Sequence, residues 1–354
     1  MMVNSWQHEY EVLKDFVAKK YQIKIEVDRT SIPGEVRPEF YRLFNIVRSA
    51  FIKQNFQSLL DEAGILIKNY LQAKKEVTEL LELDSITVST NLGNFLSNPQ
   101  SSTERILYIS LFDLLKGKLD IKSFRQKVVR EIDLTFREFS KLGYEKWVLL
   151  SLLKLLDPDK TLQVSLPQPS SHELVKYPPT SKKPVPPAQE SKNLSFVNQL
   201  CPVLTVPNFI VHLAGVGKYF AVRSGFIRPI WVTSNASKAR EWYPLDSMVA
   251  LESGLTLIYI DENPEEISLV ADRNKVCRPD LVIECMEQKG WFEKEGLEKV
   301  KLYHNSLKPR LRTYMVSKEP VLEQGQGELV EGINLLTVGF EQSKLGPIVS
   351  ALMQ

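Results

Sequence analysis

The spacing of hydrophobic residues differs on either side of a proline-rich segment, and this difference most constrains the fold. Between Leu166 and Lys192 the sequence holds seven of the chain's 20 prolines and few large apolar residues. Proline fixes its own φ and restrains the residue before it, and so little apolar surface cannot offset the entropy of ordering. The sequence therefore predicts a Pro-rich disordered linker over residues 164–195. A plain spacer and a docking ligand for a partner both fit this composition.

Residues 1–163, before the linker, are predicted to form a helical domain. Apolar residues recur at steps of three and four from Phe40 to Phe51, and a later helical pattern runs from Asp120 to Leu156. Only Ile23–Val27 has the composition of a strand. No catalytic motif is found here, so this half is interpreted as an interaction or oligomerisation domain that binds a protein partner.

Residues 196–354, after the linker, are predicted to form an α/β domain. The apolar pattern changes to that of strands, with a helical segment from Trp291 to Leu307 and a last helix from Ser343 to Leu352. A strand, a helix and a strand in this order indicate a right-handed crossover between parallel strands. The fold class is thus an all-helical domain followed by an α/β domain with a mixed central sheet. The expected strands are 255–260, 267–271, 281–285, 312–317 and 334–340.

Composition excludes several classes of protein. The three cysteines form no CxxC or CxxH cluster, which argues against a disulfide framework and a structural zinc site. The 45 basic and 43 acidic residues leave a net charge of +2, so charge alone indicates no nucleic-acid partner. Neither a signal peptide nor a long apolar stretch is present, so we expect a cytoplasmic protein without a membrane segment.

The segment RPDLVIECMEQKGWFEKEGLEKVKLYHNSLKPR, with its predicted strand, helix, strand order, resembles the PD-(D/E)XK nuclease-like superfamily. The resemblance covers the C-terminal domain only and implies a restriction-endonuclease-like sheet. In that family one strand supplies an acid, and the next supplies an acid and a lysine two residues apart. The carboxylates hold Mg²⁺ against the scissile phosphate while the lysine assists the attacking water. The implied activity is Mg²⁺-dependent phosphodiester hydrolysis.

The resemblance assigns Glu284 to the acid of the (D/E)XK motif. Met286 stands where the lysine belongs, and Lys289 is the candidate replacement. Asp280 belongs to the literal PD pair, but it shares a strand with Glu284, about 13 Å away at 3.3 Å per residue. A cross-strand partner is better placed, and Glu266 is preferred to its neighbours Glu265 and Ser268. The predicted catalytic residues are therefore Glu284, Glu266 and Lys289, and the predicted Mg²⁺ ligands are Glu284, Glu266 and Asp280.

Three interpretations of this degenerate motif remain open. The site has moved to Glu266, Glu284 and Lys289; or the domain has lost catalysis and is an adaptor or scaffold; or Glu284 is a carboxylate paired with Arg312 or Lys301. For a nucleic-acid substrate, the basic cluster Lys308, Arg310 and Arg312 is the candidate binding surface. Residues 196–354 carry 17 basic and 19 acidic side chains, which is not the basic excess typical of duplex-binding domains.

Overall fold

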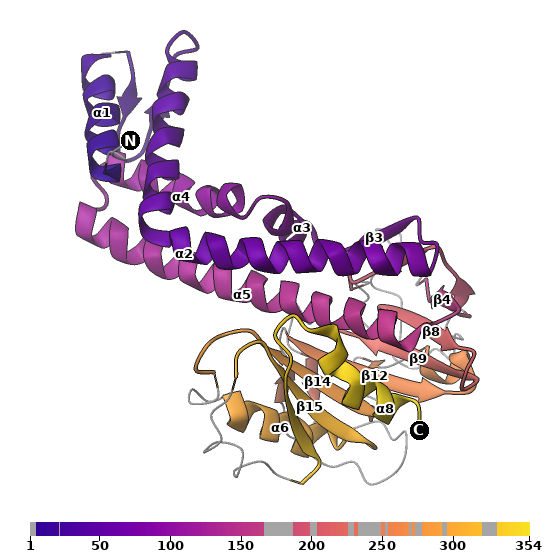
Figure 1. Ribbon diagram of the computed structural model, residues 1–354. Helices are drawn as coiled ribbons and strands as arrows, with labels where there is room; N and C mark the ends of the chain where they lie inside the picture. Colours follow the sequence, from indigo (N-terminus) through magenta and orange to yellow (C-terminus); the bar gives the residue numbers. More distant parts are fainter. Residues whose placement is uncertain are drawn as a thin grey trace. The chain divides into compact units, whose positions relative to one another are not determined.

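The computed structural model describes residues 5–20, 22–165, 187–198, 204–225, 230–232, 249–251, 254–268, 271–272, 278–291, 296–320 and 331–354. The chain divides into two compact units. The helical unit comprises Met1–Ile67 and Thr90–Ser140, and the sheet unit comprises Lys68–Ser89 and Lys141–Gln354. Two long helices, α2 (Arg37–Leu80) and α5 (Ile121–Leu156), contribute residues to both units (Figure 1).

The helical unit has an aromatic core. The rings of Trp6 on α1, Phe51 on α2 and Phe124 on α5 contact one another, with centroid separations of 5.1–5.6 Å. Helix α2 is broken at Phe56, whose backbone angles (φ −135°, ψ 19°) are not helical. The other elements of this unit are α1 (Trp6–Lys19), β1 (Lys24–Ile25), β2 (Thr30–Ser31), α3 (Thr90–Ser97) and α4 (Pro99–Leu115).

The sheet unit contains a mixed sheet of eight strands in the order β16-β15-β14-β12-β9-β8-β4-β5. Strands β14, β15 and β16 are parallel to one another, and the remaining neighbours are antiparallel. Helix α6 (Leu297–Leu307) connects β14 to β15. The strands of this sheet are β4 (Lys160–Gln163), β5 (Gln189–Glu190), β8 (Phe209–Leu213), β9 (Lys218–Arg223), β12 (Leu255–Asp261), β14 (Leu281–Met286), β15 (Arg312–Ser317) and β16 (Ile333–Thr337).

Shorter elements complete the unit. Strand β3 (Ser85–Thr87) pairs with β6 (Asn193–Ser195), β7 (Leu204–Thr205) with β13 (Ala271–Asp272), and β10 (Ile230–Val232) with β11 (Val249–Leu251). The short helices are η1 (Pro264–Ile267), η3 (Gln342–Leu345) and α8 (Gly346–Leu352).

Helices cover both faces of the sheet (Figure 1). On one face, Leu255, Leu257 and Val282 form a core cluster with Tyr303 and Leu307 of α6. Because side chains alternate along a strand, Thr256 points to the other face, where it hydrogen-bonds to Glu145 of α5. Helix α8 lies on this second face as well, since the Tyr314 hydroxyl donates to the carbonyl of Pro347 at 3.0 Å.

The predicted fold class is confirmed at the level of a helical N-terminal region and a mixed C-terminal sheet. The predicted strands at 255–260, 281–285, 312–317 and 334–340 correspond to β12, β14, β15 and β16, and β14 and β15 are parallel as expected. Four antiparallel strands of the same sheet, β4, β5, β8 and β9, were not predicted.

The predicted linker is wrong at both of its ends. Strands β5 and β6 lie inside 164–195 and pair with β4 and β3. Val164 and Leu194 are fully buried, because each contributes an apolar side chain to the core. Residues 166–186 of the predicted linker lie outside the described residues. The compact units also do not divide at the predicted boundary, because the last turns of α2 and all of α5 beyond Ser140 belong with the sheet.

The predicted strand at 267–271 is also wrong. Proline at the first position of η1 and the Asn263 side chain, which accepts a hydrogen bond from the Glu265 N–H, start a 3₁₀ helix that includes Ile267. The following strand, β13, pairs with β7 and not with β14. The hairpin that would have placed Glu266 opposite Glu284 therefore does not form.

Candidate functional site

Glu284 lies on β14, near the centre of the sheet, and is fully buried. It pairs in register with Leu255 of β12, so both side chains point to the face covered by α6. Met286 points to the same face and packs in a core cluster with Leu297 and Val300 of α6. Helix α6 therefore covers the face of the sheet on which Glu284 lies.

Two lysines surround the Glu284 carboxylate. The Lys141 Nζ is 2.8 Å from Oε1 and donates a hydrogen bond to it, and the Lys299 Nζ is 3.8 Å from the same oxygen. Lys141 comes from α5 and Lys299 from α6. The second oxygen, Oε2, is buried without a hydrogen-bond partner among the described residues. We call Lys141, Glu284 and Lys299 the Glu284 cluster.

Lys141 reaches Glu284 across Gly254, at the start of β12. A Cβ atom on Gly254 would be 1.9 Å from the Lys141 Cε and 2.6 Å from its Nζ. The backbone of Gly254 also has φ +92°, a conformation that favours glycine. Gly254 thus leaves the space through which a side chain from α5 passes to the face covered by α6.

The two acids near Lys141 keep it charged. Burial lowers the pKa of Lys141, but the negative charges of Glu284 and Glu145 and the hydrogen bond to Glu284 outweigh burial, so the pKa is raised. The ammonium therefore stays protonated at neutral pH and neutralises Glu284. It is not available as a general base.

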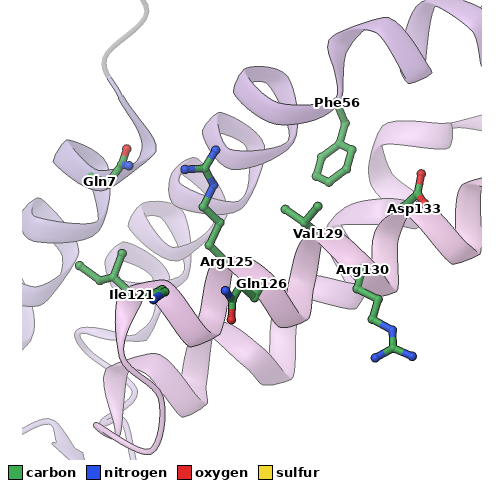
Figure 2. A pocket seen from close by; sticks show the side chains of 9 residues that line it. Gln7, Phe56, Ile121, Arg125, Gln126, Val129, Arg130 and Asp133 are labelled. Atoms are coloured by element: carbon green, nitrogen blue, oxygen red, sulfur yellow. The ribbon is translucent and has the colours of Figure 1, made fainter.

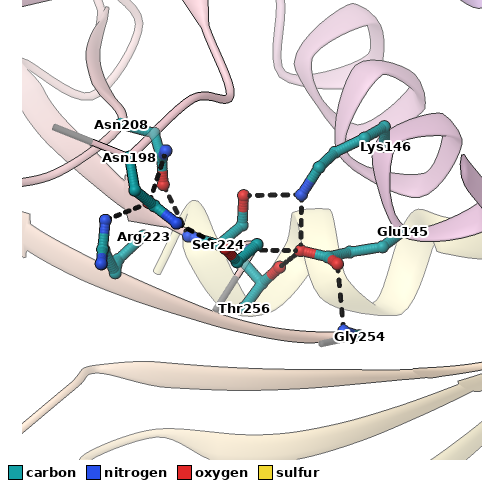
Figure 3. Close-up of polar contacts among 9 residues, drawn as sticks. Glu145, Lys146, Asn198, Asn208, Arg223, Ser224, Gly254 and Thr256 are labelled. Atoms are coloured by element: carbon teal, nitrogen blue, oxygen red, sulfur yellow. Dashed lines mark hydrogen bonds and ion pairs between the residues drawn. The ribbon is translucent and has the colours of Figure 1, made fainter. Parts of the chain in front are cut away.

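A second buried charged group lies on the opposite face of the sheet (Figure 3). Glu145 and Lys146 of α5 are 0% and 2% exposed, and the Lys146 Nζ lies 2.8 Å from the Glu145 Oε1 and 3.0 Å from the Ser224 hydroxyl. The same Glu145 carboxylate accepts hydrogen bonds from the N–H groups of Gly225 and Gly254, both at 3.1 Å. We call Glu145, Lys146 and these partners the Glu145 network.

The Glu145 carboxylate accepts hydrogen bonds from backbone N–H groups at the ends of two strands, β9 and β12. Gly225 follows β9 and Gly254 precedes β12, so their N–H groups lie where the ladder between the strands ends. A buried backbone N–H without a partner is costly, and a carboxylate satisfies two of them at once. The role of Glu145 that this geometry supports is therefore structural.

Glu145 and Glu284 lie on different faces of the sheet. Glu145 contacts Thr256, whereas Glu284 is opposite Leu255, and successive residues of β12 point to opposite faces. Both acids act on the charge of Lys141, but among the described residues only Glu284 forms an ion pair with it.

The predicted partner acid Glu266 is far from Glu284. Glu284 is in register with the first residue of β12, and Glu266 lies in η1, beyond the last. A strand rises about 3.3 Å per residue, so the six steps from Leu255 to Asp261 alone span about 20 Å. Glu266 is exposed. The predicted convergence of Glu266 with Glu284 is wrong, because η1 replaces the expected hairpin.

The remaining predicted metal and catalytic residues have other positions. The Asp280 carboxylate accepts a hydrogen bond from the Ile260 N–H at 2.7 Å and forms an ion pair with Arg310 at 3.1 Å. Lys289 is exposed in the turn after β14. Asp280 thus fixes the opposite end of β12, and Lys289 does not enter the Glu284 cluster.

The predicted basic cluster does not act as one group. Arg310 pairs with Asp280, while Lys308 ends α6 in a left-handed conformation (φ 44°). Arg312 is exposed at the start of β15. The suggested pairing of Glu284 with Arg312 or Lys301 is also wrong: Lys301 contacts Glu298, and the partners of Glu284 are Lys141 and Lys299.

The donor set around Glu284 does not fit Mg²⁺. Magnesium requires several oxygen ligands in near-octahedral geometry. Here one carboxylate faces two ammonium groups, and the position of the family's lysine is a methionine in the hydrophobic core. Among the described residues no group of three or more His, Cys, Asp or Glu side chains is arranged to hold a metal.

Sequence reasoning missed Lys141, Glu145, Lys146 and Lys299. A signal was present in Lys141–Leu150, KLGYEKWVLL, where three charged residues interrupt an apolar helix next to a tyrosine and a tryptophan. Charged residues on the apolar face of a helix are rarely buried without partners. Their partner could not be named from the sequence, because Lys141 and Glu284 are 143 residues apart.

Comparison with known proteins identifies no relative for this arrangement. The chain matches no protein-family model, no curated protein and no solved structure.

No described helix is both long enough and apolar enough to cross a bilayer.

Proposed function

We propose that the C-terminal part of this protein is a nuclease-like domain that acts as a non-catalytic scaffold. The observation that carries this proposal is the environment of Glu284, whose charge is neutralised by Lys141 beneath helix α6. Met286, in place of the family's lysine, packs in the core beside it. A nuclease needs its acids open to substrate and metal, and this acid is enclosed.

The nuclease-like part of the proposal is supported by strand order. Strand β12 is antiparallel to β14, β14 carries the acid, and α6 then leads to the parallel strand β15. An antiparallel strand beside the acid-bearing strand and a crossover helix to a parallel strand agree with the resemblance, whereas the family's first acid has no counterpart opposite Glu284, where Leu255 stands. In a scaffold, the Glu284 cluster has a structural role in which Lys141 and Lys299 connect α5 and α6 to the central strand.

The test of this proposal is a metal and cleavage assay on the full chain. Calorimetric titration with MgCl₂ is expected to show no binding that depends on Glu284. Incubation with single- and double-stranded DNA and RNA in Mg²⁺ or Mn²⁺ is expected to give no cleavage. The variant Glu298→Gln is the matched control, because Glu298 is an exposed carboxylate on α6. Cleavage by the wild type and by Glu298→Gln, but not by folded Glu284→Gln, would contradict the scaffold proposal.

A second candidate function is Mg²⁺-dependent phosphodiester hydrolysis, against which stands the donor set of one carboxylate and two ammonium groups. One observation favours it: the Glu284 Oε2 has no hydrogen-bond partner among the described residues, and an ammonium group lies 2.8 Å from Oε1. An acid beside a lysine is the pair that the family uses, here with the lysine supplied by α5. The same assay separates the two candidates, since hydrolysis requires that both Glu284→Gln and Lys141→Met abolish cleavage.

A further inference from the structure

The helical unit contains an open groove that the nuclease-like resemblance does not explain. Its volume is about 970 Å³, and its walls come from α1, from the break in α2 and from the first half of α5 (Figure 2). Residues lining the groove are Gln7, Phe56, Ile121, Lys122, Arg125, Gln126, Val129, Arg130 and Asp133.

The floor of the groove is apolar. Figure 2 shows the Val129 side chain pointing toward Phe56, at the position where α2 is broken. At the end of the groove Ile121 keeps 43% of its surface exposed, which is high for a large aliphatic residue. The Gln7 Oε1 is buried without a hydrogen-bond partner among the described residues. The groove therefore offers mainly apolar surface to a ligand.

Positive charge lines this apolar floor. Arg125 and Val129 are four residues apart and so lie on one face of α5, while Arg130 lies at the rim of the groove with its side chain pointing away from Phe56 in Figure 2. Neither Arg125 nor Arg130 forms an ion pair with a carboxylate of the described residues, whereas the acid in the lining, Asp133, is held by Arg137 at 2.8 Å. Two guanidinium groups thus remain available to a ligand.

We propose that this groove binds an acidic amphipathic helical segment of a protein partner. The apolar side chains of such a segment fit over Phe56, Ile121 and Val129, and its carboxylates pair with Arg125 and Arg130. Walls formed by helices suit an apolar stripe with i, i+3, i+4 spacing. A nucleic-acid backbone would use the arginines but leave the apolar floor without a partner. This proposal does not depend on the proposed function of the sheet unit.

The binding test uses the full-length protein and a fluorescein-labelled synthetic peptide. The peptide has about 14 residues, or about four helical turns, with leucines on one face and glutamates beside them. A second peptide carries lysine in place of every glutamate. Fluorescence anisotropy is expected to show saturable binding of the acidic peptide that weakens with salt, and no binding of the basic one.

Matched variants locate the site. Arg125→Glu is expected to weaken binding about tenfold or more, and Ile121→Ser about threefold, through lost charge and lost apolar contact respectively. The controls are Arg105→Glu and Ile109→Ser on α4, two exposed residues that do not line the groove, and each is expected to stay within about twofold of the wild type. Far-UV circular dichroism confirms that each variant is folded.

Several outcomes would overturn the proposal. These are no binding of the acidic peptide, equal binding of the basic peptide, or affinity unchanged in both folded Arg125→Glu and Ile121→Ser. Displacement of the peptide by duplex DNA from the wild type, together with loss of DNA binding in Arg125→Glu, would assign the groove to nucleic acid instead.

Discussion

Lys141 on helix α5 and Glu284 on strand β14 form a buried ion pair, 2.8 Å long, that crosses the sheet at Gly254. The lysine starts on one face and its ammonium binds the carboxylate on the other. This pair connects the two helical layers of the sheet unit through the strand that the nuclease-like resemblance identifies as acid-bearing. The first prediction concerns the energy of this pair.

We expect Lys141→Met to destabilise the sheet unit by about 3–5 kcal/mol, because it leaves a buried carboxylate with one distant lysine. The double variant Lys141→Met, Glu284→Leu should recover more than half of this loss, since an apolar pair removes the unpaired charge. Urea denaturation measures both. Lys301→Met removes an exposed ion pair on α6 and should change stability by less than about 0.5 kcal/mol. Equal effects of Lys141→Met and Lys301→Met would show that the buried pair has no special role.

The second prediction concerns Gly254. Alanine there is strained at φ +92° and its Cβ would overlap the Lys141 side chain, so Gly254→Ala should destabilise the protein by more than about 2 kcal/mol. Gly290 is the matched control, because its φ is +70° but a Cβ atom there would meet nothing within 4 Å. Gly290→Ala should therefore lower the free energy of unfolding through backbone strain alone, by about 1 kcal/mol. Thermal or urea unfolding compares them. If both substitutions lower the free energy of unfolding by the same amount, the Lys141 side chain does not reach Glu284 across Gly254.

The third prediction concerns acid stability through Glu76 on α2. Burial raises the pKa of this carboxyl, but hydrogen bonds from Lys154, Gln72 and Gln342 outweigh it and lower the pKa from 4.5 to about 2. A lowered folded-state pKa adds stability above the unfolded pKa, and this stability is lost as the pH falls from about 4.5 toward 2.

We therefore expect Glu76→Gln to reduce stability at neutral pH by about 1–2 kcal/mol, a value discounted for partial solvent exposure. The difference from the wild type should shrink as the pH falls below about 4.5 and disappear only below about pH 2, where Glu76 is protonated in the folded state as well. Urea unfolding across this pH range measures it. Glu79→Gln, in an exposed pair with Lys75, is the control. A constant difference between Glu76→Gln and wild type at every pH would contradict the assignment.

The fourth prediction concerns the thiol of Cys285, which is fully buried on the face of β14 opposite to Glu284 and Met286. Burial raises its pKa, and the charges of Glu145 and Glu284 raise it further, so little thiolate forms at neutral pH. In a protein with Cys201 and Cys277 changed to serine, a thiol reagent at about pH 8 should react at the rate of unfolding.

The control for Cys285 is Lys289→Cys combined with Cys285→Ser, which places the single thiol in the exposed turn three residues beyond β14. This thiol should react at once in the native state. If Cys285 reacts as quickly as the thiol at position 289, the face of β14 opposite to α6 is open to solvent and the buried position of Cys285 is wrong.

The local pattern of apolar residues was sufficient to predict the longer strands of the C-terminal sheet. Strands β12 and β14 consist mainly of β-branched and aliphatic residues, and β15 holds Thr313, Tyr314 and Val316, which favour strands. The alternation along β14 correctly placed Glu284 and Met286 on one face. The strand predicted at 267–271 failed because Pro264 and Asn263 start a 3₁₀ helix there. The prediction of a linker failed at residues 189–195 because β5 and β6 are only two and three residues long, too short to give a recognisable strand pattern.

The amino-acid sequence by itself determined that an acid occupies a central strand, that a methionine replaces the expected lysine, and that a crossover helix follows. The tertiary structure alone decided what the acid contacts. Register placed Leu255 opposite Glu284, and the absence of a side chain at Gly254 let Lys141 of a distant helix reach it. Alternation along a strand is a local property of the backbone, whereas a buried charge takes its partner from whichever segment packs beside it, and that depends on the whole fold.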